Sequence, residues 1–159
     1  MTKNFLCLLA MLLSACASPK PSRYQIESQS PTPKSFSVGS KWGFVLLDSN
    51  GEIFKTVIFE ITDVEMKTCE SGTNKVLKII SERPVGVYPR LLNPTYEVTG
   101  AAIRISFSPE LCDANYALIG SISELGAVGS HTPEELTFSK QSKSVGGIFY
   151  GFPVENKSF

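Results

Sequence analysis

The sequence predicts an all-β fold, most simply a small antiparallel barrel and, as the second choice, a β-sandwich. From Lys41 onward, short apolar, β-branched and aromatic runs follow one another. Clusters of Gly, Pro, Asn, Asp and Ser separate these runs, and no stretch has the apolar periodicity of an amphipathic helix of three turns. The spacing of the runs predicts about seven to nine strands.

The first expected strand is Trp42–Leu47, and Asn50-Gly51 behind it is the dipeptide most typical of a tight hairpin. Glu52–Met66 continues as one long strand in which alternate residues form a more apolar face. Lys75–Ile80 is the next expected strand. These three strands make up the first part of the expected β-rich domain.

Thr95–Ser108 shows the most regular alternation in the chain, and we expect it to form one half-buried strand. One face would carry Ile103, Ile105 and Phe107, and the other Arg104, Ser106 and Ser108. The remaining expected strands are Tyr116–Ser123, a stretch near Ala127, Leu136–Ser139 and Gly147–Pro153.

Two short helical turns are predicted, at Ser108–Cys112 and Thr132–Leu136, because each has a capping hydroxyl, then proline, then an acidic residue. Glycines crowd the last third of the chain and are expected to mark bends that let the sheet curl; they lie at positions 120, 126, 129, 146, 147 and 151. A closed, lipocalin-like barrel is thus the first choice, as an architectural analogy only.

The N-terminus has the layout of an export signal. Lys3 precedes the apolar run Phe5–Leu13, which is too short to span a membrane as a helix. The run ends in Leu13-Ser14-Ala15-Cys16, which resembles the lipobox of bacterial lipoproteins. The resemblance implies that residues 1–15 are removed, that Cys16 is acylated and that Ala17 directs the protein to the outer membrane. An ordinary secretory signal with an incidental Cys16 is the alternative.

Residues 16–40 would then be the lipidated N-terminus and a flexible tether, and 41–159 a single β-rich domain. The tether is rich in Pro and Ser and has few large apolar residues. At about 3.1 Å per residue it would reach on the order of 70 Å from the bilayer that holds the acylated Cys16.

Charge and cysteine content narrow the function further. The chain has 15 basic and 15 acidic residues, so it lacks the basic footprint of a nucleic-acid-binding protein. Without Cys7 and Cys16, the cysteines that remain are Cys69 and Cys112. An oxidising compartment favours a disulfide between them, which the loop-entropy relation values at about 4 kcal/mol.

Catalytic signals are weak. His131 is the only histidine, and Ser130 beside it is the nearest candidate nucleophile of a hydrolase. A Gly-x-Ser-x-Gly elbow is absent, and the acidic pairs fit solvated turns better than a metal site. We therefore predict no catalytic residue, no metal ligand and no cofactor.

Binding residues are better candidates. Tyr88 and Arg90 lie in a proline-bounded apolar segment and are candidate contacts for a partner. Phe149 and Phe152 are expected in the core. The sequence predicts a non-enzymatic binding or assembly module for an envelope protein or polymer. A carrier of a small apolar ligand and a hydrolase that uses His131 are the alternatives.

Overall fold

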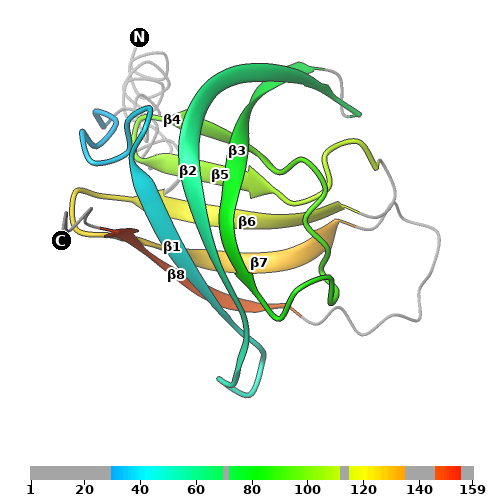
Figure 1. The fold of residues 1–159 in the computed structure, drawn as a ribbon. Coiled ribbons are helices and arrows are strands. Elements are labelled where there is room, and N and C mark those ends of the chain that lie inside the picture. Colours follow the sequence, from blue (N-terminus) through cyan, green and yellow to red (C-terminus); the bar gives the residue numbers. More distant parts are fainter. Residues whose placement is uncertain (1–29, 70–71, 112–114, 135–145, 155–159) are drawn as a thin grey trace, which may run out of the picture.

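The structure, a computed structural model, describes residues 30–69, 72–111, 115–134 and 146–154. In this part of the chain, eight antiparallel strands form a closed barrel in sequence order, and β8 pairs with β1 (Figure 1). The strands are β1 Lys41–Leu47, β2 Ile53–Thr68, β3 Gly72–Arg83, β4 Thr95–Thr99, β5 Ala102–Ser106, β6 Asn115–Ile122, β7 Ala127–Glu134 and β8 Gly147–Val154. The predicted all-β antiparallel barrel is confirmed.

The first hairpin forms where Asn50-Gly51 predicts it. Gly51 has a φ of 84°, which a residue without Cβ adopts at little cost. The Asp48 carboxylate accepts hydrogen bonds from the backbone amides of Asn50 (2.8 Å) and Glu52 (3.0 Å). These bonds lower the pKa of Asp48, and the turn sets the register of β1 against β2.

The prediction of one strand over Thr95–Ser108 is wrong, because β4 and β5 form a hairpin there. Gly100, with a φ of 61°, makes the turn that brings Thr99 opposite Ala102. A hairpin preserves the alternation of both arms, so the pattern alone does not reveal the turn. Ile103, Ile105 and Phe107 are buried as expected, whereas Ser106 and Ser108 of the expected solvent face are buried too.

Neither helical turn is present in the described residues. Residues 108–111 form a β-turn, closed by a hydrogen bond of 2.9 Å from Leu111 N to Ser108 O. Thr132–Glu134 continues β7, because the ladder to β6 extends as far as the pair Asn115 and Glu134. Cys112 and residues 135–139, including the strand expected at Leu136–Ser139, lie outside the described residues. No helix of the described chain is long and apolar enough to cross a membrane.

Large side chains fill the barrel interior. The fully buried set combines aliphatic residues with five large aromatic residues, Trp42, Phe44, Phe59, Phe107 and Phe149. Glycines on the inner face allow this close packing. A Cβ on Gly151 would lie 2.7 Å from the Phe44 ring, and a Cβ on Gly129 would clash first with the backbone carbonyl of Ile119 and would also lie 2.7 Å from the Phe149 ring. The glycines of the last third thus fit the aromatic core into a small barrel.

Residues 30–40, here called the strap, dock on the barrel and do not form a free tether. Phe36 is only 6% exposed and packs edge-on against Trp42 and Tyr96. The Trp42 Nε1–H group donates to Ser35 O over 2.9 Å. The Glu124 carboxylate accepts from the amides of Lys34 (2.6 Å) and Ser35 (3.0 Å). The expectation of a flexible segment up to residue 40 is therefore wrong from about residue 33 onward.

Cys69 is disulfide-bonded, and Cys112, its expected partner, lies outside the described residues. Cys69 N donates to Pro109 O over 2.8 Å, which holds the end of β2 beside the segment that leads to Cys112. The pairing of these two cysteines stays a prediction.

Candidate binding surface

The connection from β3 to β4 closes one end of the barrel and carries the two binding residues that the sequence predicts. β3 and β4 pair at only two positions, Lys75 with Tyr96 and Val76 with Thr95. The rest of β3 has no partner in β4, and a long connection runs from Arg83 back to Thr95. The first part of this crossing reads Arg-Pro-Val-Gly-Val-Tyr-Pro-Arg, and we call residues 83–90 the arginine-bracketed loop.

This loop exposes apolar side chains. Val85 is 78% exposed, Val87 52% and Tyr88 61%. Arg83 and Arg90 are also exposed, and within the described part of the chain neither guanidinium makes an ion pair. The loop therefore presents an apolar centre between two cations. Of its residues, Tyr88, Arg83 and Arg90 are of the types that are enriched in binding hot spots.

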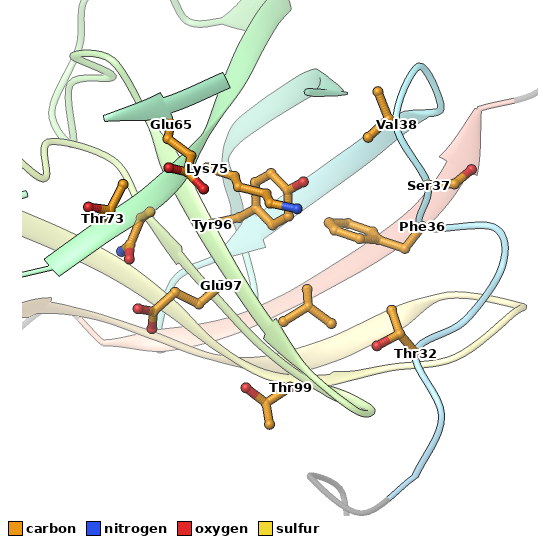
Figure 2. Close-up of a pocket in the computed structure, with 12 residues that line it drawn as sticks. Thr32, Phe36, Ser37, Val38, Glu65, Thr73, Lys75, Tyr96, Glu97 and Thr99 are labelled. Carbon is orange, nitrogen blue, oxygen red and sulfur yellow. The ribbon is translucent and has the colours of Figure 1, made fainter. Parts of the chain in front are cut away.

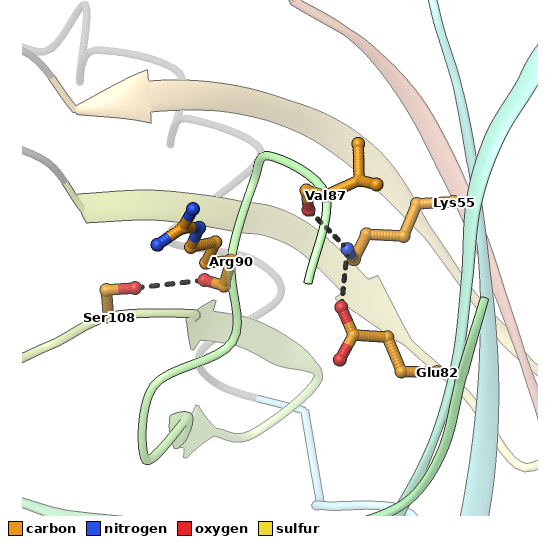
Figure 3. Close-up of polar contacts among 5 residues, drawn as sticks. All are labelled: Lys55, Glu82, Val87, Arg90 and Ser108. Carbon is orange, nitrogen blue, oxygen red and sulfur yellow. Dashed lines mark hydrogen bonds and ion pairs between the residues drawn. The ribbon is translucent and has the colours of Figure 1, made fainter. Parts of the chain in front are cut away.

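The loop backbone is nevertheless held in place by side chains of the barrel (Figure 3). Lys55, which is 1% exposed, donates from Nζ to Val87 O over 2.9 Å and pairs with Glu82 at 2.7 Å. Ser108 Oγ donates to Arg90 O over 3.0 Å. A buried ammonium without partners would cost several kcal/mol, so Lys55 ties the position of the loop to the stability of the barrel.

The side chain of Tyr88 also contacts the barrel. Its ring lies 5.9 Å from that of Tyr116 in an edge-to-face contact. Tyr116 in turn shares a hydrogen bond with Nδ1 of His131, whose Nε2 lies 2.7 Å from Leu47 O. Because a carbonyl only accepts, Nε2 carries the proton and Nδ1 accepts from the Tyr116 hydroxyl. The loop thus rests on a buried polar chain whose groups are satisfied.

Burial sets the protonation of this chain. Desolvation lowers the pKa of His131, which keeps the imidazole neutral, although its bond to Leu47 O opposes the shift. Desolvation, with a smaller effect from Tyr88, raises the pKa of Tyr116, so its hydroxyl stays a donor. Both rings have the arrangement of a structural core pair.

The structure does not bring together the serine and histidine of the hydrolase alternative. Ser130 and His131 are neighbours on β7, so their side chains point to opposite faces of the sheet. His131 is buried, Ser130 is exposed and both imidazole nitrogens are occupied. Within the described residues, no three His, Cys, Asp or Glu side chains are placed to hold a metal ion.

A groove of about 570 Å³ lies at the other end of the barrel (Figure 2). The strap forms one wall, the projecting part of the β2–β3 hairpin another, and β4 the floor. The residues that line it are Thr32, Phe36, Ser37, Val38, Glu65, Thr73, Asn74, Lys75, Tyr96, Glu97, Val98 and Thr99. No local pattern in the sequence predicts this groove, because its two walls and its floor come from segments that are far apart in the chain.

The strap and the arginine-bracketed loop occupy opposite ends of the barrel. The strap bonds to the barrel at Ile61, where Gly39 N donates to Ile61 O over 2.8 Å and Ile61 N to Ser40 O over 2.9 Å. The loop is held by Lys55, near the other end of the long strand β2 and beside the β1–β2 hairpin (Figure 1). With a rise of about 3.3 Å per residue, the six steps along β2 from Lys55 to Ile61 separate these attachments by roughly 20 Å.

The sequence identified Tyr88 and Arg90 by residue type and proline context, and the structure places both on one exposed loop. It missed Lys55 and Glu82, because their pairing depends on the register of β2 against β3. Comparison of the chain with protein-family models, with curated proteins and with solved structures finds no match, so the surface is interpreted from its own geometry.

Proposed function

We propose that the protein is an outer-membrane lipoprotein, anchored through acylated Cys16, that acts as a non-enzymatic binding or assembly module. Its partner is an envelope protein that docks on the arginine-bracketed loop. The observation that carries the proposal is the exposure of Val85, Val87 and Tyr88 on a loop whose backbone is fixed by Lys55 and Ser108.

Fixed loops bind at a lower entropic cost than mobile ones. An ordered side chain loses about 0.5–1.5 kcal/mol of rotamer freedom on binding, and a mobile loop loses backbone freedom as well. Here the carbonyls of Val87 and Arg90 are already held. The partner surface that fits is an apolar pocket for Tyr88 with carboxylates on its rim for Arg83 and Arg90.

The positions of the two barrel ends favour a partner away from the anchoring bilayer. A chain that is anchored through Cys16 enters the barrel at the strap, which is the end opposite the loop. The loop therefore lies at the barrel end opposite the one where the strap enters. The filled interior gives no support to the alternative of an apolar ligand carried inside the barrel.

Photo-crosslinking in the native envelope tests the binding surface. A photoreactive phenylalanine analogue at position 88 should give one major protein adduct. The matched control is position 125, because Leu125 is 90% exposed but lies on the β6–β7 turn, close to the strap. Adducts of equal yield from both positions, or none from position 88, would refute the proposed surface.

The lipid anchor needs its own test. Labelled palmitate should enter the full chain and should be lost from the Cys16→Ser variant, while a variant at Cys7 keeps the label. If the parent chain takes up no palmitate, the anchor and the outer-membrane location are wrong, whatever the crosslinks show.

A further inference from the structure

The outer face of β8 is apolar along its length. Ile148 is 44% exposed, Tyr150 48% and Phe152 46%, whereas Phe149 and Gly151 between them point inward and are buried. The expectation of a core position is thus confirmed for Phe149 and wrong for Phe152. A barrel strand with one face in solvent usually alternates apolar with polar residues, so three successive apolar outer positions are unusual.

The apolar face continues onto both neighbouring strands. Tyr150 lies opposite Val45 on β1 and opposite Val128 on β7, which is 43% exposed. Ile148 lies opposite Leu47 and Ser130. Along this stretch, the outward residues of β8 and their register partners carry no charge. Such a neutral face does not repel a copy of itself.

A hollow of about 320 Å³ lies next to this row of projecting side chains. Gly43 forms part of its floor, and the Phe152 ring covers Gly43 so closely that a Cβ there would lie 2.8 Å from the ring. The outward residues around it include Val45, Thr56, Ile58 and Arg83. A projecting aromatic side chain and a hollow that can accept one therefore occupy the same face.

We propose that two copies of the chain associate through this face about a two-fold axis, with Tyr150 of each copy inserted into the hollow of the other. A two-fold interface uses the same patch twice, so it requires this pairing of projection and hollow within one patch.

The exposed area predicts a reversible dimer. Four side chains of this face are nearly half exposed, namely Val128, Ile148, Tyr150 and Phe152. Together they offer roughly 400 Å² per copy, or about 800 Å² in total, which is below the area of standard specific interfaces and fits a weak contact. Acylation would confine both copies to one membrane and raise their effective concentration, which strengthens a weak contact without new interactions.

Cysteine crosslinking in the native membrane tests the contact directly. In the full chain, Tyr150→Cys should give a covalent dimer with a short bifunctional maleimide reagent, because each introduced thiol would lie beside the hollow of the other copy and the two thiols need not meet at disulfide distance. Leu125→Cys, which is more exposed but off this face, is the matched control and should stay monomeric. No dimer from position 150, or equal dimer from both positions, would overturn the proposal.

A charge substitution tests the strength of the contact. Native mass spectrometry of detergent-purified full chain should show dimer for the parent and for Tyr88→Glu, and monomer for Tyr150→Glu. Two buried carboxylates without partners should weaken the dimer at least about a hundredfold. Because position 150 is exposed, the variant should keep the melting temperature of the monomer, and circular dichroism checks this.

Three results would overturn the dimer: a parent chain that stays monomeric, a Tyr150→Glu variant that stays dimeric, or a face that crosslinks only to lipid or to another protein. The proposed function is tested separately. Tyr150→Glu should keep the partner adduct from position 88, and Tyr88→Glu should lose partner binding but keep the dimer.

Discussion

His131 makes the stability of the barrel depend on pH, and the variant that tests this is His131→Gln. The imidazole is 1% exposed and neutral, and it donates to Leu47 O and accepts from Tyr116. Burial lowers its pKa below the ordinary value of 6.5. Glutamine keeps a donor and an acceptor but does not titrate in this range.

The sign of the effect follows from proton binding. Below pH 6.5 the unfolded chain takes up a proton at position 131 before the folded chain does. The stability from the neutral imidazole is therefore complete above pH 6.5 and is lost as the pH falls below it. The limiting slope is about 1.4 kcal/mol per pH unit, so lowering the pH from 7.5 to 5.5 removes up to about 1.4 kcal/mol.

Urea titrations at pH 7.5, 6.5 and 5.5 measure this slope. Trp42 is the only tryptophan and is fully buried, so its emission reports unfolding of the barrel. The variant should be less stable at every pH, by about 1–3 kcal/mol, because Gln fits the two partners less well. Its stability should nevertheless change less between pH 7.5 and 5.5. Parallel curves for parent and variant would show that His131 is not the group that titrates.

Three further predictions follow from the packing of the strap and the inner face. Phe36→Ala should lower the free energy of unfolding by about 3 kcal/mol, whereas Val38→Ala, on an exposed strap residue, should change it by less than about 0.5 kcal/mol in the same urea assay. Glu124→Ala removes the acceptor of two strap amides and should speed their hydrogen exchange, measured by mass spectrometry, without slowing or speeding exchange in β5. Gly151→Ala would place a methyl group 2.7 Å from the Phe44 ring and should cost about 1–3 kcal/mol; a melting temperature equal to that of the parent would contradict the filled interior.

Local patterns predicted the elements whose causes are local. Alternation over Glu52–Met66 predicted β2, and Asn50-Gly51 predicted the first hairpin, because side-chain period and turn chemistry act within a few residues. The β4–β5 turn was missed, because apolar and polar residues alternate with the same two-residue period before and after Gly100. The helical turn at Thr132–Leu136 was wrong, because the ladder to β6 outweighs a capping pattern.

The candidate site was predicted only in part for a related reason. Tyr88 and Arg90 stand out by type and by the prolines around them, and no register is needed to find them. The support beneath them is non-local: Lys55 and Glu82 meet only once β2 and β3 are paired, and Ser108 comes from beyond β5. In the sequence, Phe36 is a single aromatic residue in a polar segment, and nothing near it predicts burial. Only the folded barrel brings Trp42 and Tyr96 into contact with its ring.

Docking of the strap shortens the tether of a chain attached at Cys16. Residues 17–32 then separate the lipid from the docked part of the strap, and at about 3.1 Å per residue they span roughly 50 Å instead of roughly 70 Å. The volume that the barrel can sweep above the bilayer shrinks accordingly. The barrel of such a chain could not reach an envelope component that lies further from the bilayer than this tether allows. Residues inserted before position 30 would increase the distance that it can reach.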